Sequence, residues 1–284
     1  MRASPRKATA GNHDHRAIPD THLMLDTPEA DRGMHDFAST IADIIALDPA
    51  PDVIVHTGDI AHNGRADEYA RAAAILAAAR APVYVLAGNR DDRRNLRAAF
   101  SARGYLAPGA DCIDFVVEDY PVRLIALDTL SPGDNKGEFS AAQAERLIAA
   151  IDAHKTKPVA VFTHHPPFEV MVGPERFHFK SADGMSRLRG ALQRCDRVIA
   201  VFSGHVHRAA EGFVGPIPAS VVQCIATTLR KGEYPPSMRN RPVYHLHRFD
   251  PAWGFATETR LVKSEPNSHE RSTASISAAS LADG

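Results

Sequence analysis

Cysteine is scarce in this 284-residue chain, and the three that occur, Cys112, Cys195 and Cys224, are scattered without a Cys-x-x-Cys spacing. An odd, dispersed set argues against a disulfide framework and predicts buried free thiols in a cytosolic protein. No run approaches the roughly 18 apolar residues that a membrane-spanning helix needs. The basic start, Met1–Lys7, is not followed by the apolar segment of a secretory signal. We therefore expect a cytoplasmic protein that does not enter a membrane.

A charge of one sign is also missing, because 33 basic and 34 acidic residues leave a net charge of -1. This balance gives no electrostatic footprint for nucleic acid or for an anionic membrane surface. The hydrophobic content of 44% and the charged content of 24% are ordinary for a soluble globular protein. A small-molecule substrate is therefore the expected partner.

The two ends of the chain differ in composition from its centre. Residues 1–16 are polar and basic and are expected to form a disordered arm, and the Ser- and Ala-rich residues 264–284 a disordered tail. Residues 17–263 are expected to form one domain. Only Ala17 and Ile18 are apolar before Asp20, so the first strand is either short or built in an unusual way from residues 8–16.

Between the ends, segments with helical spacing alternate with short apolar runs, which is typical of an α/β fold. The tight link at 119–121 suggests a hairpin, Ser140 is a plausible helix N-cap, and the last third looks β-rich without helices. The pattern predicts two packed mixed sheets flanked by helices. The expected helices cover 34–45, 66–80, 140–152 and 184–193, and the expected strands cover 52–57, 82–87, 112–118, 122–128, 158–163, 197–203, 221–227, 243–249 and 256–262.

Polar side chains suited to metal binding follow five of these strands, each cluster directly after its apolar run. The carboxyl ends of strands in open α/β sheets are where ligands gather. A mixed set of Asp, Asn and His donors suits Mn, Fe or Zn rather than a soft thiolate site. The sequence therefore predicts a two-metal phosphoesterase. The clusters are Asp20-Thr21-His22, Gly58-Asp59, Gly88-Asn89, Thr163-His164-His165-Pro166 and Gly204-His205-Val206-His207.

These motifs, together with Leu127-Asp128-Thr129 and the extension of the second cluster to Gly64, resemble those of the calcineurin-like metallophosphoesterases. In detail the chain is similar to the bacterial branch of class III cyclic-nucleotide phosphodiesterases and glycerophosphodiesterases. The resemblance spans residues 17–260. It implies a four-layer αββα sandwich, two divalent or trivalent metal ions (Mn, Fe or Zn) and, as in related folds, a homodimer.

The resemblance also implies which residues hold the metals. His164 is chosen over His165 because it lies nearer the end of its strand. The pair of metals would activate a bridging hydroxide for in-line attack on phosphorus. The first metal would be held by Asp20, His22 and His207, the second by Asn89, His164 and His205, and Asp59 would bridge both.

One position departs from the family pattern Gly-Asn-His-Asp, because this chain has Gly88-Asn89-Arg90-Asp91. Arginine cannot act as a general acid, since its pKa exceeds about 12. It can still bind phosphate oxygens and stabilise developing negative charge. Three interpretations are open at this point. The enzyme cleaves only good leaving groups, a neighbouring histidine supplies the proton, or activity on natural diesters is largely lost.

The expected function is hydrolysis of phosphodiesters, with 3′,5′-cyclic nucleotides as candidate substrates. Two alternatives are a weakened or non-catalytic scaffold that binds metal and phosphate, and a phosphomonoesterase or nucleotide-derivative hydrolase. Arg93, Arg94 and Arg97 are expected to form a solvated helix face, although Arg93 is close enough to Asn89 to meet phosphate. His245 and His247 are expected on a half-exposed sheet face. The candidate catalytic residues are Asp59, Asn89 and Arg90, and the candidate substrate contacts are Asn89, Arg90, His62, His165 and His178.

Overall fold

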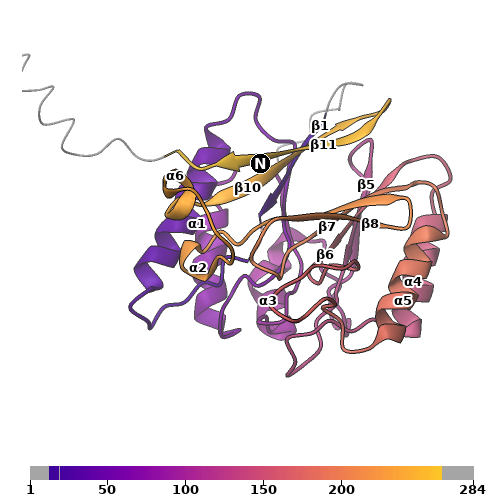
Figure 1. Cartoon of the computed structure of the whole chain (residues 1–284), viewed down its shortest axis with the longest axis horizontal. Helices are drawn as coiled ribbons and strands as arrows, with labels where there is room; N and C mark the ends of the chain where they lie inside the picture. The colour runs from indigo at the N-terminus through magenta and orange to yellow at the C-terminus, as the bar shows by residue number, and fades with distance from the viewer. Residues whose placement is uncertain (1–12, 19, 264–284) are drawn as a thin grey trace, which may run out of the picture.

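The computed structural model describes residues 13–18 and 20–263, in which two β-sheets lie between two groups of helices (Figure 1). The first sheet has the order β11-β10-β1-β2-β3, with β1, β2 and β3 parallel and β10 and β11 antiparallel. Among the described residues, no helix is both long and apolar enough to cross a membrane. The strands are β1 (His13–Ile18), β2 (Val53–His56), β3 (Val83–Val85), β10 (Val243–Asp250) and β11 (Gly254–Leu261).

The second sheet has the order β4-β5-β6-β7-β9-β8, with a parallel centre and antiparallel edge strands. Its strands are β4 (Phe115–Val117), β5 (Arg123–Leu127), β6 (Val159–Thr163), β7 (Val198–Ser203), β8 (Ala210–Val214) and β9 (Ile217–Val221). The helices are α1 (Ala30–Ile45), α2 (Ala66–Leu76), α3 (Arg93–Phe100), α4 (Ala141–Asp152), α5 (Ala182–Gln193) and α6 (Pro236–Arg239), with 3-10 turns at Ser101–Arg103 and Thr227–Leu229.

The second sheet is apolar on both faces because it is covered on both sides. In β5, Leu124 and Ala126 join the core shared with the first sheet, whereas Ile125 and Leu127 pack in the core beneath α4 and α5. Successive side chains of a strand point to opposite faces, so a continuous apolar run is what a doubly covered strand requires. The layer order is thus helix, sheet, sheet, helix, which confirms the predicted four-layer sandwich.

The expectation of a disordered arm over residues 1–16 is wrong for residues 13–16, which belong to β1, while residues 1–12 lie outside the described residues. The strand His13–Ile18 pairs antiparallel with β10 and parallel with β2, so all six residues are buried. Apolar periodicity could not reveal this strand, because its burial follows from having a neighbour on each side. Both ring nitrogens of His15 are buried and have no hydrogen-bond partner within residues 13–18 and 20–263.

The last third also differs from the prediction in three places. The strand expected at 221–227 is replaced by the hairpin β8–β9, which ends at Val221, and by a 3-10 turn. A one-turn helix, α6, follows in a region expected to have none. His245 and His247 are 5% and 1% exposed rather than half-exposed, because their face of β10 packs toward the second sheet, where His247 stacks on Phe202.

Helix starts were easier to predict, since capping residues act locally. Ser140 accepts a hydrogen bond from the Gln143 main-chain nitrogen, and the Gln143 side chain accepts one from the Ser140 main chain. This reciprocal pair satisfies two main-chain donors that the first turn of α4 would otherwise leave free. The expected N-cap at Ser140 is confirmed.

Candidate metal centre

The predicted ligands lie in loops that follow five strands, three from the first sheet and two from the second. Asp20 and His22 follow β1, Asp59 follows β2 and Asn89 follows β3. From the second sheet, His164 follows β6, and His205 and His207 follow β7. The site therefore stands at the carboxyl ends of strands from both sheets, which explains how residues up to 187 positions apart in the chain meet.

One cluster joins Asp20, His22, Asp59 and His207, whose potential ligand atoms all lie within 4.8 Å of one another. The Nε2 atoms of His22 and His207 are 2.9 Å apart. Such a pair of ring nitrogens can share at most one proton, and a metal ion is the other group that such nitrogens can face together.

A second cluster surrounds the side-chain oxygen of Asn89. His164 Nε2 lies 3.0 Å and His205 Nδ1 lies 2.9 Å from Asn89 Oδ1. Between the clusters stands Asp59, whose Oδ2 is 3.4 Å from His22 Nε2 and 3.5 Å from His164 Nε2. A single carboxylate oxygen thus faces both sets of donors.

Main-chain oxygens fix the orientation of two of the rings. The Nδ1 atom of His164 lies 2.8 Å from the carbonyl oxygen of Thr57, and that of His207 lies 3.0 Å from the carbonyl oxygen of Leu229. Each ring can donate its Nδ1 proton there and leave the Nε2 lone pair facing the site, an arrangement typical of metal-binding histidines.

The backbone is unusual at five of the predicted ligands. Among the described residues, the only non-glycine residues with positive φ are members of this set. Left-handed conformations are costly for residues with a side chain, and they cluster where function requires a particular geometry. The residues are Asp20 (45°), His22 (42°), Asp59 (52°), His205 (75°) and His207 (57°).

Two glycines allow the loops after β2 and β3 to touch. A Cβ atom on Gly88 would lie 2.3 Å from both the main-chain nitrogen and Oδ1 of Asp59. One on Gly58 would lie 2.6 Å from the main-chain nitrogen of Gly88 and 2.7 Å from His164 Nδ1. The glycines preceding Asp59 and Asn89 are therefore required by the close approach of these loops.

Burial gives the site its electrostatic character. Burial raises the pKa of Asp20 to about 8, with the Asp59 carboxylate adding to the effect. Burial lowers the pKa of His22 to about 3, which keeps its ring neutral at pH 7. Although burial opposes it, the Asp59 carboxylate raises the pKa of His164 to about 9. A buried carboxylate that holds a proton, or that is paired with a protonated histidine, is typical of a site in which metal cations replace those protons.

Arg90 lies at the rim of this centre. Its main-chain nitrogen donates a 2.7 Å hydrogen bond to Asp59 Oδ1, and its side chain is exposed. His62 is half-buried, with its ring centre 5.6 Å from that of His22, and its Nδ1 has no hydrogen-bond partner among the described residues. Both side chains are thus free to meet a substrate at the metals.

The other two histidines considered as substrate contacts are already engaged. His165 is fully buried, with Nδ1 2.8 Å from the Thr129 hydroxyl and Nε2 3.2 Å from the Asn135 carbonyl oxygen. His178 is also buried, and its Nε2 lies 3.0 Å from the Val170 carbonyl oxygen. His165 also belongs, with His164 and His205, to a group of possible metal ligands whose ligand atoms all lie within 4.8 Å of one another. The His178 ring centre lies 5.1 Å from that of His205.

Arg93, expected on a solvated helix face within reach of phosphate, instead pairs with a buried carboxylate. Its guanidinium donates to both carboxylate oxygens of the fully buried Asp128, at 2.6 and 2.9 Å, and to the Leu130 carbonyl oxygen. It therefore balances a buried charge and holds α3 against the loop after β5.

Two buried residues beside the ligands were not predicted to take part. The Asp91 carboxylate accepts hydrogen bonds from the main-chain nitrogens of Ile60, Ala61 and Gly88, so it joins the two loops that carry Asp59 and Asn89. Its place in the motif Gly88–Asp91 was the available signal. The second is Cys224, which forms a cluster of possible ligands with His22 and His207. A lone cysteine outside any motif gave no signal.

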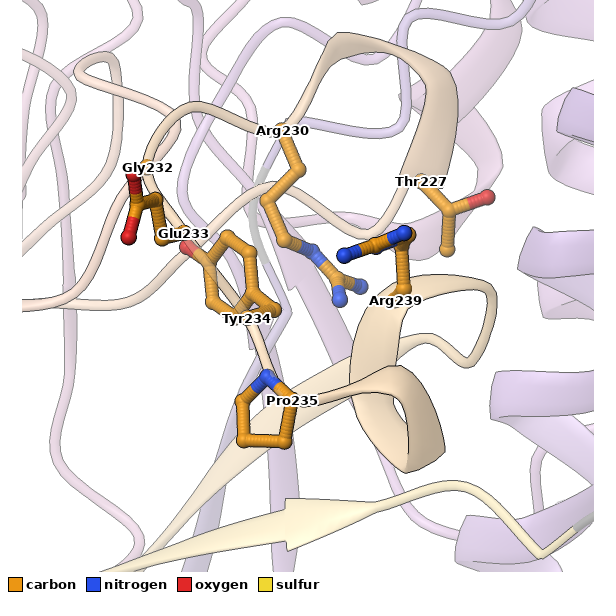
Figure 2. A pocket seen from close by; sticks show the side chains of 7 residues that line it. All are labelled: Thr227, Arg230, Gly232, Glu233, Tyr234, Pro235 and Arg239. Atoms are coloured by element: carbon orange, nitrogen blue, oxygen red, sulfur yellow. The ribbon is translucent and has the colours of Figure 1, made fainter.

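A pocket of about 630 Å³ adjoins the segment that supports His207 (Figure 2). Leu229 accepts from the His207 ring, and the Lys231 main-chain nitrogen donates to the His207 carbonyl oxygen. Arg230 lies over the ring of Tyr234, with its guanidinium carbon 5.1 Å from the ring centre. The lining residues are Thr227, Arg230, Gly232, Glu233, Tyr234, Pro235 and Arg239.

Comparisons with known proteins agree with this geometry. The family model for calcineurin-like phosphoesterases matches residues 16–209. A protein of Arcobacter nitrofigilis named probable glycerophosphodiester phosphodiesterase GpdQ is 30% identical over 221 residues, covering 76% of this chain and 80% of that protein. The 3′,5′-cyclic adenosine monophosphate phosphodiesterase CpdA of Pseudomonas aeruginosa is 26% identical over 214 residues, covering 72% of this chain and 75% of that protein.

Solved structures share the fold at lower identity. A dimetal phosphatase from Danio rerio aligns with a TM-score of 0.64 and 16% identity, over 88% of this chain and 99% of its own. The family match covers more than half of the chain and confirms the resemblance drawn from the motifs. The chain belongs to the calcineurin-like phosphoesterase family.

Proposed function

We propose that this protein is a dinuclear metal-dependent phosphodiesterase. The observation that carries the proposal is the position of Asp59, whose Oδ2 faces His22 on one side at 3.4 Å and His164 on the other at 3.5 Å. In this assignment Asp20, His22 and His207 hold one ion, Asn89, His164 and His205 hold the other, and Asp59 bridges them. The names of the relatives, a glycerophosphodiesterase and a cyclic-nucleotide phosphodiesterase, support a diester substrate.

The donor set fits two ions of Mn, Fe or Zn, since it combines imidazole nitrogens with carboxylate and amide oxygens. When bound, such a pair supplies Lewis-acid activation of water and of the phosphoryl group. The protein's own part is to orient the donors, which the Thr57 and Leu229 carbonyl oxygens do for His164 and His207. Asn89 can bind metal through its oxygen and donate its amide protons to a phosphate oxygen.

Arg90 is proposed to bind the phosphoryl oxygens. Its side chain is exposed and unengaged, and its main chain is fixed on Asp59, so the guanidinium can reach a phosphate at the metals. It can stabilise charge on phosphate but cannot protonate the leaving oxygen. Esters whose leaving group departs without a proton should therefore be the better substrates. Hydrolysis of cyclic nucleotides, whose leaving group is an alkoxide, should be slow.

If a histidine supplies the proton instead, His62 is the one favoured by its surroundings. Its Nδ1 has no hydrogen-bond partner in the described part of the chain, whereas His165 has both ring nitrogens engaged and His178 is buried against Val170. A substrate-facing role for His165 or His178 would require these contacts to break.

The test is hydrolysis of an activated aryl phosphodiester and of cyclic AMP by the metal-loaded wild type, Arg90→His and the control Arg94→His. General acid catalysis is worth about 10²–10⁴-fold, so Arg90→His should raise cyclic AMP hydrolysis within that range and change aryl ester hydrolysis little. Arg94 is exposed on α3, and its substitution should change neither rate. Equal cleavage of both esters by the wild type would indicate that another residue protonates the leaving group, with His62 as the first candidate. Bound metal without turnover of either ester by any variant would replace this proposal by the scaffold function.

A further inference from the structure

The sulfur of Cys224 lies beside the first metal cluster. Cys224 lies in the loop that follows β9, and the residue is fully buried. Its Sγ and ring nitrogens of His22 and His207 all lie within 4.8 Å of one another. Sγ also donates a 2.9 Å hydrogen bond to the main-chain oxygen of Asp20. The thiol thus contacts the loop that carries Asp20 and His22, and its sulfur lies close to the rings of His22 and His207.

We propose that Cys224 is a further ligand of the ion held by Asp20, His22 and His207, bound as a thiolate. This inference rests on the metal centre of the proposed function and names a donor that the motifs of that centre do not include.

The spacing of the three donors suits one ion. Zinc binds thiolate at about 2.3 Å and imidazole at about 2.0–2.1 Å, so donors at the tetrahedral angle on one ion lie about 3.3–3.6 Å apart. The three donor atoms lie within 4.8 Å of one another, so binding one ion requires them to move closer by at most about 1.5 Å. The Nδ1 atom of His207 is engaged by the Leu229 carbonyl oxygen, which leaves its Nε2 for the ion.

Charge favours the same assignment. Among the proposed ligands only Asp20 and Asp59 are anionic, so they bring two negative charges to the four positive charges of two divalent ions. A buried centre is costly while its charge is unbalanced. A bound cation deprotonates a coordinating thiol outright, and the sulfur then adds a third negative charge. Thiolate ligation also biases the centre toward Zn or Fe and away from Mn.

The segment that carries the sulfur is held to the segment that supports His207. Arg230, whose side chain lies in the pocket of Figure 2, donates from Nε to the Cys224 carbonyl oxygen at 3.4 Å. Its guanidinium also donates to the carbonyl oxygens of Met238 and Arg241. Cys224 and the Leu229 carbonyl oxygen that orients His207 are therefore parts of one braced loop.

The test is substitution of the metals by Co²⁺, because thiolate bound to Co²⁺ gives a near-ultraviolet charge-transfer absorption that does not depend on turnover. We expect this band in the wild type, its loss in Cys224→Ser, and its retention in Cys112→Ser and Cys195→Ser, whose sulfurs are free and half-buried elsewhere. Zinc affinity, measured by competition with a chromophoric chelator, should fall at least about 10-fold in Cys224→Ser alone, since even outer partners of ligands are worth that much.

A wild type that binds Co²⁺ without the band, or a band that survives in Cys224→Ser, would overturn the proposal and leave Cys224 as a thiol that holds the Asp20 main chain. Failure to bind Co²⁺ would overturn it too. Should Cys224→Ser not fold, X-ray absorption of the zinc-loaded wild type decides, by the presence or absence of sulfur at about 2.3 Å. A band without ester hydrolysis would refute the proposed activity alone, and hydrolysis without the band would refute the ligand alone.

Discussion

Lowering the pH should destabilise this protein through His15, a histidine that is far from the metal ligands in the fold's first strand. His15 is fully buried between the two sheets, opposite His247 on β10, and neither of its ring nitrogens has a partner among the described residues. Burial lowers the pKa of His15 to about 3, helped by the charges of His13 and Arg16. In the unfolded chain His15 is protonated below about pH 6.5, whereas in the folded chain it stays neutral. The contribution of His15 to the free energy of unfolding is therefore fully present above that pH and is lost as the pH falls below it.

The size of the effect follows from this difference in pKa. Each pH unit between the two pKa values is worth about 1.4 kcal/mol, so lowering the pH from about 7.5 to about 5 should cost about 2 kcal/mol through His15 alone. Urea unfolding of wild type and His15→Leu across that range measures it. Histidines that do not face His15 contribute to both proteins equally, so the difference between the profiles reports the proton of His15 together with its effect on the neighbouring His247. Parallel pH profiles would show that His15 is protonated in the folded protein and would refute the reasoning.

Two other substitutions test the packing around the site. Gly88→Ala should weaken metal binding at least about 10-fold, because its Cβ would lie 2.3 Å from Asp59, the proposed bridging ligand. Gly190→Ala, with nothing within 4 Å, should not weaken it. Metal titration of both variants decides, and an unchanged affinity in Gly88→Ala would contradict the close approach. Arg93→Met should destabilise folding by about 3 kcal/mol, because it leaves the fully buried Asp128 without its cation. Denaturant unfolding measures this loss, and a change within about 0.5 kcal/mol would place Arg93 among ordinary surface residues.

The loops that carry the proposed ligands could be located from the sequence, because the signal for each loop is local. Each ligand follows a strand end, and motifs such as Gly204–His207 and Gly58-Asp59 combine a metal-binding side chain with a glycine that permits the turn. The strands of the second sheet that are covered on both faces can also be predicted from the sequence, since Val159–Thr163 is apolar on both faces. What these segments share is that their neighbours in the sequence determine their environment.

Other features depend on partners that are distant in the sequence. The strand His13–Ile18 is polar, and only its position between β10 and β2 buries it. Cys224 has no motif and meets His22 across about 200 residues of chain. The Arg93 guanidinium likewise pairs with the buried Asp128 carboxylate, whereas spacing predicted a solvated helix face. Composition and periodicity carry no information about such contacts, because they arise only when the two sheets are assembled.

The central claim is that Asp59 joins two metal ions in a phosphodiesterase. The most direct measurement is the metal content and aryl phosphodiester hydrolysis of the wild type beside Asp59→Asn, after removal of metal and reloading with Mn or Zn. We expect two ions per chain and metal-dependent hydrolysis in the wild type, and loss of at least one ion together with the activity in Asp59→Asn. Two ions and full activity in Asp59→Asn, or hydrolysis by the metal-free wild type, would contradict it.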